Sequence, residues 1–363
     1  MKIMKRKYIK LGKIKETINQ KTKAKTTKSF NYGFAILRPL LAFLVVAAHN
    51  FNSKSTKNKY ILNITKNRLF HVPCFFIMSF YLTHKSLLSL NLKAIIYRLL
   101  RLLIPYIGWP MIVMKLNHIY NKKHHTNYPD TYRQLKLQFL WGKPIIGQLW
   151  FQWHLIVFSI FFIIIIFIFR KHTLFILHLL LISVFVVQYK GFDYNKYLIN
   201  FPNESKRTLR FFFGAATFPI IGFTLGFCNI IDYLGKRKIK TLVISVIIYY
   251  ILENYQIFHN TRGFGYVGIE LNIKSLCLIF IFSSFPSEKI RNKYLSKFII
   301  VITNYTAGVF YLHIVIRRYF SDYFNDLKRG TFRGLFIDYI ICYFICFFGM
   351  LIFGKTPIKH MFC

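Results

Sequence analysis

Residues 155–169 read Leu-Ile-Val-Phe-Ser-Ile-Phe-Phe-Ile-Ile-Ile-Ile-Phe-Ile-Phe, and Ser159 is the only polar residue among them. The core of a soluble domain does not require such a run. Similar apolar blocks recur along the chain, and each is long enough to cross roughly 30 Å of hydrocarbon as a helix. The 363 residues are 55% hydrophobic, and this clustered distribution predicts an all-α, polytopic transmembrane helix bundle.

The apolar blocks predict about ten transmembrane helices. They are expected near residues 31–50, 68–90, 95–116, 147–170, 172–188, 211–231, 240–259, 265–285, 298–320 and 332–353. Together they form a predicted transmembrane domain, residues 31–353. A basic tail, residues 1–30, precedes this domain, and a short C-terminal tail, residues 354–363, follows it.

Some predicted spans contain residues that a lipid-facing helix would avoid. Pro105 and Pro110 predict a kink in the third span. Glu270 and Lys274 suggest that the eighth span is tilted or partly interfacial. Other polar groups inside spans are candidates either for chemistry or for bonds to neighbouring helices, and these are Glu253, Asp338 and His178.

The charge of the chain is strongly positive, with 51 Lys and Arg against 11 Asp and Glu. Most basic residues lie in short links between apolar blocks, without a nucleic-acid-binding motif around them, so nucleic acid is not expected as a partner. Lys and Arg beside a membrane attract anionic lipids and set orientation. We expect residues 1–30 to be disordered, and both termini to be cytosolic, in a plasma, inner or secretory-pathway membrane.

The six cysteines predict no metal site. None of them forms a Cys-x-x-Cys pair, and five sit in apolar blocks, where cysteine behaves as a small hydrophobe. Cys342 and Cys346 are one helical turn apart, but a metal would need more ligands nearby.

The first span carries Arg38 and His49, eleven residues apart. At about 100° per residue they share one helix face, roughly 16 Å apart along the axis. An arginine inside a span costs energy unless it faces protein or water, so Arg38 is a candidate functional residue. The alternative is that Arg38 snorkels to the inner headgroups and that His49 lies at the outer interface.

Basic side chains also open the second and third spans. His71 lies near the outer end of the second span, close to where His49 should emerge; the alternative is that it is an interface residue, as such histidines more often are. Arg98 and Arg101 are neighbours on one face of the third span. Paired guanidinium groups suit phosphate, since each can donate two parallel hydrogen bonds. The alternative is that they anchor lipid headgroups and set orientation.

Two later spans complete the set of candidate residues. Trp150 and Trp153 open the fourth span and fit an aromatic belt at the membrane interface. The ninth span presents polar and small residues between Asn304 and Gly308, and then reaches His313.

Taken in order, these stretches resemble the acyltransferase-3 family of integral membrane O-acyltransferases, in its fucose O-acetylase-like branch. Five family motifs match between residues 34 and 320. They are Arg-(ten residues)-His at Arg38 and His49, His-x-Pro-x-Phe-Phe-x-x-Ser-Gly-aromatic at residues 71–81, Arg-x-x-Arg-x-x-x-Pro at residues 98–105, Leu-Trp-Phe at residues 149–151 and aromatic-Leu-His at residues 311–313.

The resemblance implies transfer of an acyl group, usually acetyl, from acyl-coenzyme A to a hydroxyl of an extracytoplasmic or lipid-linked glycan. A hydroxyl needs a base with a pKa near neutral, a role that we assign to His49. Arg38 would guide the donor or stabilise developing negative charge, and Arg98 and Arg101 would hold the donor phosphates. The candidates for acceptor binding are His71, His313 and Trp150. Acyl-coenzyme A is expected as a substrate rather than a resident cofactor, and membrane lipids as further partners.

Two other functions stay open. A carrier or flippase for a glycan or lipid would also place polar groups inside spans, although the chain has no internal repeat and no paired broken helices. An inactive relative is the third possibility, because Phe80 stands where the family has glycine after the second-span serine. If that glycine admits a helix or a ligand, Phe80 would fill the space.

Overall fold

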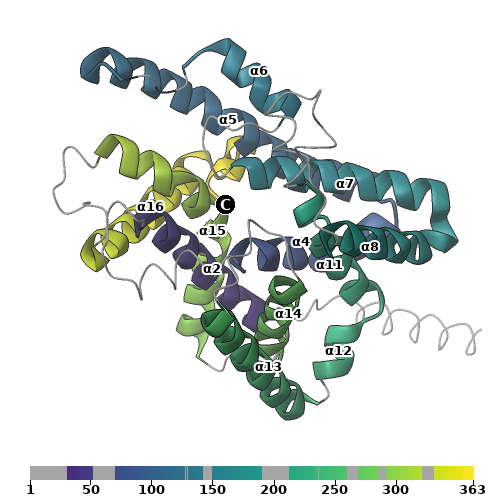
Figure 1. The fold of residues 1–363 in the computed structure, drawn as a ribbon. Helices are drawn as coiled ribbons and strands as arrows, with labels where there is room; N and C mark the ends of the chain where they lie inside the picture. The colour runs from purple at the N-terminus through teal and green to yellow at the C-terminus, as the bar shows by residue number, and fades with distance from the viewer. Residues whose placement is uncertain are drawn as a thin grey trace, which may run out of the picture.

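The protein folds as a bundle of helices (Figure 1). The computed structural model describes residues 31–51, 70–126, 128, 130–141, 149–189, 212–235, 237–259, 269–285, 292–320 and 331–363. These residues contain helices and turns and no strand, so the prediction of an all-α membrane bundle is confirmed. The predicted basic tail, residues 1–30, lies outside the described residues.

Each of the ten predicted spans contains a helix. These helices are α2 (Tyr32–Asn50), α4 (His71–Leu88), α5 (Leu92–His124), α7 (Leu149–Phe169), α8 (Thr173–Tyr189), α11 (Thr217–Phe227), α13 (Lys238–His259), α14 (Ile269–Ser283), α15 (Lys293–Phe320) and α16 (Phe332–Phe353). Shorter elements join them, namely α6 (Tyr132–Trp141), α12 (Ile230–Gly235) and the 3-10 helices η1 (Arg170–His172) and η3 (Pro357–Met361).

Length and composition support a membrane location. Within the described residues, five continuous helical segments are long and apolar enough to span a bilayer, one of them being α7 and α8 taken together. The outer faces of the bundle also carry large exposed apolar side chains, such as Phe167 on α7 and Ile251 on α13. A water-soluble protein rarely exposes so much apolar surface, whereas lipid tails solvate it well.

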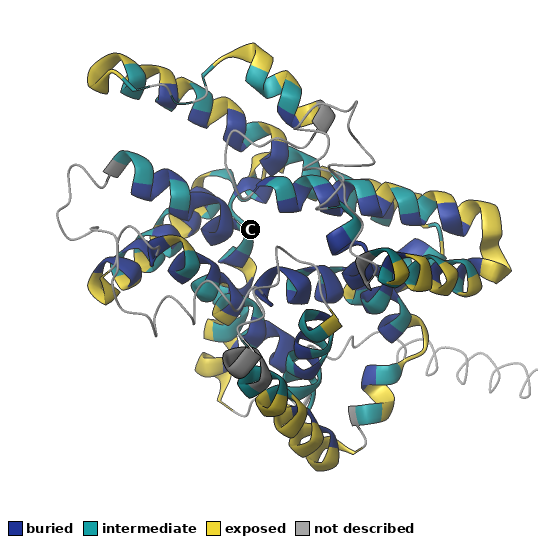
Figure 2. Ribbon diagram, in the orientation of Figure 1, coloured by how far each residue is buried: buried dark blue, intermediate teal, exposed yellow. Residues whose placement is uncertain are grey.

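Helices α2 and α4 occupy the middle of the bundle. Helix α2 packs against α4, α14, α15 and α16, while α4 packs against α5, α7, α11 and α14. The burial pattern agrees, since the buried residues gather at the centre and the exposed ones lie on the outlying helices (Figure 2). Residues on α2 and α4 are therefore the best placed to line an internal site.

The most extensive helix contact in the described part of the chain joins α4 and α11, and glycines on α11 allow it. Gly222 and Gly226 are four residues apart on one face of α11, the small-xxx-small pattern of membrane helix pairs. A Cβ atom at Gly222 would overlap the backbone of Ile77, and one at Gly226 would overlap the ring of His84. The two backbones can approach this closely only because these positions lack side chains.

Of the two charged residues in the eighth predicted span, Lys274 lies inside the bundle, while Glu270 is half-buried. Lys274 on α14 is 2% exposed, and its Nζ donates to Glu253 Oε2 on α13 at 2.9 Å. The two charges neutralise each other between the helices, as a membrane interior requires. His178, another candidate from the sequence, directs Nδ1 to the Leu174 carbonyl of its own helix at 2.7 Å.

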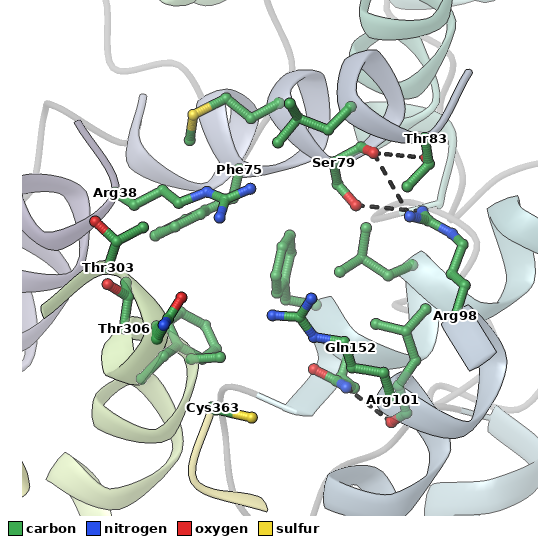
Figure 3. Close-up of a pocket in the computed structure, with 18 of the residues that line it drawn as sticks. Arg38, Phe75, Ser79, Thr83, Arg98, Arg101, Gln152, Thr303, Thr306 and Cys363 are labelled. Carbon is green, nitrogen blue, oxygen red and sulfur yellow. Dashed lines mark hydrogen bonds between the residues drawn. The ribbon is translucent and has the colours of Figure 1, made fainter. Parts of the chain in front are cut away.

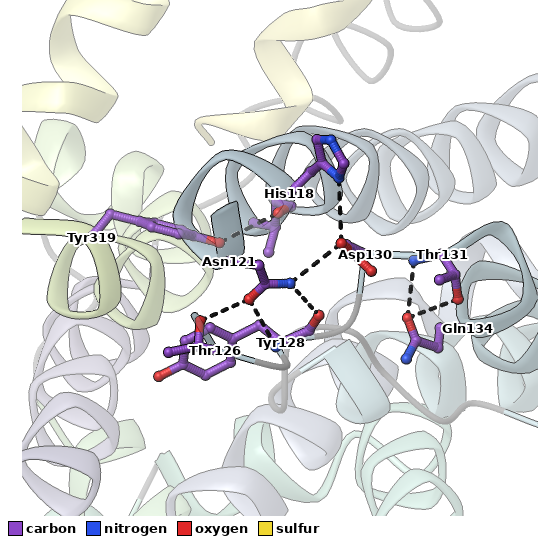
Figure 4. Close-up of polar contacts among 9 residues, drawn as sticks. His118, Asn121, Thr126, Tyr128, Asp130, Thr131, Gln134 and Tyr319 are labelled. Carbon is purple, nitrogen blue, oxygen red and sulfur yellow. Dashed lines mark hydrogen bonds and ion pairs between the residues drawn. The ribbon is translucent and has the colours of Figure 1, made fainter. Parts of the chain in front are cut away.

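Helix α5 continues through Pro105 and Pro110 and ends at His124, beyond the predicted limit near residue 116. A polar turn then reverses the chain into α6 (Figure 4). The Asn121 side chain accepts from the Tyr128 backbone N–H at 2.9 Å and donates to the Tyr128 carbonyl at 2.9 Å. Asp130 lies within 3.3 Å of the Asn121 amide and 3.4 Å of His118. The Asn121 side chain therefore satisfies both backbone polar groups of Tyr128.

The C-terminal segment, residues 354–363, folds back onto the bundle. Trp109 Nε1 on α5 donates to the Met361 carbonyl at 3.2 Å, and the Phe362 ring packs on Trp109 with centroids 6.0 Å apart. Cβ atoms at Gly308 and Gly349 would collide with Phe362, so α15 and α16 leave room for this residue. This packing brings Cys363 toward the interior.

Candidate functional site

A cavity of about 420 Å³ lies among α2, α4, α5, α7 and α15, and Cys363 reaches it from the C-terminal segment (Figure 3). Much of its lining is polar. The polar side chains are Arg38, Ser79, Thr83, Ser86, Tyr97, Arg98, Arg101, Gln152, Thr303, Asn304, Thr306, Tyr311 and Cys363. The lining includes no carboxylate side chain among the described residues. The three arginines that sequence analysis selected therefore meet in one place, which we call the arginine cavity.

Arg38 reaches the cavity from α2, and its guanidinium points inward in Figure 3. Helix α2 is held against its neighbours at this level. Tyr339 OH on α16 donates to the Pro39 carbonyl at 2.7 Å, and Thr303 Oγ1 on α15 donates to the Ala35 carbonyl at 2.5 Å. Among the described residues Arg38 has no ion-pair partner, so the placement of α2 directs its side chain.

Arg98 is fixed by neutral partners. Its Nε donates to Ser159 Oγ at 3.1 Å, and its Nη2 donates to Ser79 Oγ at 3.2 Å. Its guanidinium also lies over the Phe80 ring, 5.1 Å from the centroid. These contacts position the cation without cancelling its charge, which stays available to an anionic ligand.

Phe80 does not fill the cavity. Its side chain is fully buried and packs against Phe162 on α7, with ring centroids 4.8 Å apart. It is absent from the lining, whereas Ser79 beside it faces the cavity. Phe80, which replaces the family glycine, therefore lies in the contact between α4 and α7, and one face of its ring packs against the Arg98 guanidinium.

Arg101 stands one helical turn after Arg98 and is exposed at the cavity wall. Cys363 lies at the same wall. Burial raises the pKa of the Cys363 thiol, although Arg101 and Lys359 nearby act to lower it. The thiol is therefore mainly protonated at neutral pH, and the strong charges of this wall belong to the arginines.

His49 and His313 form a pair outside the cavity lining. Their ring centroids are 5.2 Å apart, with His49 exposed at the end of α2 and His313 fully buried on α15. His313 Nδ1 donates to the Val309 carbonyl at 3.2 Å, so the neutral ring keeps a lone pair on Nε2. That atom has no hydrogen-bond partner within the described part of the chain.

A buried ion pair, which the sequence analysis missed, adjoins the histidines. Arg317 lies one turn after His313 on α15, and its Nη2 donates to Asp338 Oδ2 on α16 at 2.6 Å. The same nitrogen lies 3.5 Å from the Val46 carbonyl of α2. The pair ties three helices together beside His49. Opposite charges on successive spans, Arg317 and Asp338, were the signal that could have revealed it.

The other two candidates lie apart from both groups. His71 is the first residue of α4 and is buried, and Trp150 is half-buried beside Phe151 and His154. Neither residue lines the arginine cavity. The structure thus unites Arg38, Arg98 and Arg101, pairs His49 with His313, and places His71 and Trp150 elsewhere.

These features define an integral membrane protein with a cationic cavity inside a helical bundle. Comparison with known proteins supplies the family. The family model described as "Acyltransferase domain" (Acyl_transf_3) matches residues 31–355. The match covers most of the chain, which therefore belongs to this acyltransferase-3 family.

One curated relative is also similar. It is named "Probable poly-beta-1,6-N-acetyl-D-glucosamine export protein", from Staphylococcus aureus (strain MRSA252), and is 24% identical over 245 residues, which is 62% of this chain. The chain spans 65% of the length of that relative. No solved structure matches the chain.

Proposed function

We propose that this membrane acyltransferase takes an acyl group, usually acetyl, from acyl-coenzyme A and transfers it to a hydroxyl of a glycan or another extracytoplasmic acceptor. One observation carries the proposal. Three arginines share a cavity whose described lining holds no Asp or Glu side chain, while His49 lies eleven residues after Arg38 on α2, paired with His313 outside that lining. The polyanionic donor would bind in the arginine cavity, and the base would act at the histidine pair.

The donor phosphates would bind in the arginine cavity. Coenzyme A is rich in phosphate, and guanidinium groups recognise phosphate through parallel, charge-assisted hydrogen bonds. Arg98 is held in place by Ser79 and Ser159, so less side-chain freedom is lost when an anion binds. Arg38, on the face of α2 that leads to His49, would lie nearest the acyl end of the donor.

The acyl group would be transferred at the histidines. His49 takes the proton of the acceptor hydroxyl while its oxygen attacks the thioester carbonyl. A carbon–oxygen ester bond forms, the carbon–sulfur bond breaks, and coenzyme A leaves as a thiolate that regains the proton from His49. The His313 ring, 5.2 Å from His49 between centroids, would orient His49 or the acceptor.

The same arrangement suits a path across the membrane. Arg38 and His49 are eleven residues apart on α2, about 16 Å along the helix axis at 1.5 Å per residue. With the arginines toward the cytosol and the histidines outward, the donor and the acceptor would approach from opposite sides. An even number of spans, such as the ten that the sequence predicts, would place both termini on the same side, which we propose to be the cytosol.

The experiment is acyl transfer in membranes. Membranes that contain the full chain receive acetyl-labelled acetyl-coenzyme A, and label is measured in material other than coenzyme A. Incorporation that depends on the protein is the expected result. An absence of incorporation, from any acyl-coenzyme A tested, would contradict the proposal.

A carrier is the second candidate function, because the curated relative is named an export protein. Its name concerns an N-acetylated polysaccharide, which is also compatible with an acceptor glycan. The two functions differ in their products. A carrier moves its cargo unchanged, whereas an acyltransferase leaves a new ester, which mass spectrometry of surface glycans from cells with and without the protein would detect.

A further inference from the structure

Three phenylalanine rings from three helices meet at one end of the arginine cavity. They are Phe75 on α4, Phe151 on α7 and Phe310 on α15, and all three contribute to the lining. Their ring centroids are 6.1 Å apart for Phe75 and Phe151, 6.2 Å for Phe75 and Phe310, and 5.6 Å for Phe151 and Phe310. Rings at these separations touch one another.

The rings stand at the histidine end of the cavity. On α4, Phe75 is the lining residue nearest to His71, and on α7, Phe151 is the lining residue nearest to Trp150. On α15, Phe310 and Tyr311 are the lining residues nearest to His313, and the Phe310 ring lies 6.3 Å from the His313 ring. The three rings therefore form a layer between the arginines and the histidines, which we call the aromatic septum.

The septum has little room to spare. Phe151 and Phe310 are 7% and 6% exposed, and Phe151 also packs on Phe76 with centroids 4.6 Å apart. Next to the septum, Tyr311 OH on α15 bonds to the Gln152 side chain on α7, which holds these two helices together. Phe75 is only half-buried. An acyl chain that passed through the septum would have to displace these rings. Phe75, the most exposed of the three, has the most space to turn.

We propose that the aromatic septum of Phe75, Phe151 and Phe310 selects the acyl chain, admitting acetyl thioesters and excluding longer ones. This inference rests on the proposed function, in which the acyl end of the donor travels from the arginines to His49. A slender thioester arm that carries acetyl displaces the rings least. A longer acyl chain would have to pass the same three rings, and densely packed side chains resist extra methylene groups.

The test compares donors of increasing chain length. Membranes with the wild-type chain, Phe310→Ala or Phe75→Ala receive labelled acetyl-, butyryl- or hexanoyl-coenzyme A, and transfer is measured for each donor. Wild type should prefer acetyl. Each variant should raise the ratio of hexanoyl to acetyl transfer by about tenfold or more, the scale on which apolar pockets discriminate methylene groups.

A matched control and a conservative variant keep the result interpretable. Phe167→Ala removes a ring from the lipid-facing side of α7, where Phe167 is 64% exposed, and should leave the ratio at the wild-type value. Phe310→Leu retains most of the buried volume and should change the ratio less than Phe310→Ala. Size-exclusion chromatography in detergent establishes whether each variant is folded. If Phe310→Ala does not fold, Phe75→Ala carries the test, because Phe75 is only half-buried.

The outcomes separate the two proposals. Wild-type acetyl transfer, combined with an unchanged ratio in both folded alanine variants, would overturn the selection by the septum and leave the proposed function standing. Absence of transfer from every donor by the wild-type chain would overturn the proposed function and, with it, the selection.

Discussion

The arginine cavity and the His49–His313 pair handle charge in opposite ways. In the cavity, Arg98 is held by serine hydroxyls and an aromatic ring, and the described lining includes no Asp or Glu side chain. Beside the histidines, the Arg317 cation is met at 2.6 Å by Asp338. One region keeps its positive charge for a ligand, and the other cancels it within the protein.

This difference distinguishes arginines that are available to bind a ligand from an arginine that holds helices together through an ion pair. A buried cation without an anionic partner is costly in a membrane, and such residues tend to mark binding sites or pathways. A buried pair contributes little net stability, but the loss of one partner is expensive. We therefore expect the cavity arginines to affect ligand binding, and the Arg317–Asp338 pair to affect folding.

The largest effect is expected at His49. His49→Ala should lower acyl transfer by about 10²- to 10⁴-fold, the usual range for a lost general base, while the protein still inserts and folds. His178→Ala is the matched control, because His178 is exposed on α8 and bonds to its own helix. Labelled acetyl transfer in membranes measures both. Full transfer by His49→Ala would remove the histidine pair from the chemistry.

The next test breaks the ion pair beside the histidines. Asp338→Leu alone should destabilise the fold by about 3–5 kcal/mol, because Arg317 is left buried without its partner. The double variant Arg317→Met with Asp338→Leu should recover most of that stability and most of the transfer activity. Thermal unfolding in detergent and transfer assays report the two properties. A double variant that is stable but inactive would show that the pair takes part in the reaction.

A smaller effect on a different parameter is expected in the cavity. Arg98→Gln with Arg101→Gln should raise the KM for acetyl-coenzyme A by about 10- to 100-fold, a total loss of about 1.4–2.8 kcal/mol, because glutamine keeps neutral hydrogen bonds in place of the charged ones. The fold should survive. Arg170→Gln controls for the general loss of a basic residue, because Arg170 is exposed at the turn between α7 and α8. An unchanged KM would mean that the two arginines serve orientation instead.

Much of the fold could be predicted because the spans are encoded locally. A run such as residues 155–169 has to be a membrane helix whatever it packs against. Eleven-residue spacing placed Arg38 and His49 on one face of α2, and three-residue spacing placed Arg98 and Arg101 side by side on α5. The roles of these residues stay predictions until the variants are measured.

The features that the sequence did not reveal depend on packing between distant segments. Arg317 and Asp338 are 21 residues apart and meet only because α15 and α16 lie side by side. The return of residues 354–363 depends on Gly308 and Gly349, which leave space for Phe362. The aromatic septum joins three helices whose phenylalanines, each taken alone, look like ordinary core residues.

The smallest change in acyl transfer is expected at Phe80. If it blocked a ligand, a smaller residue would open the site and raise activity. Because Phe80 packs on Phe162 and lies outside the cavity lining, Phe80→Leu should keep acyl transfer within about twofold of wild type and cost about 1–2 kcal/mol of stability, the lower range for core truncations. Phe80→Gly should cost more, because it also removes the surface on which Arg98 rests. A severalfold gain of transfer in either variant would identify Phe80 as an obstruction and support the inactive-relative hypothesis.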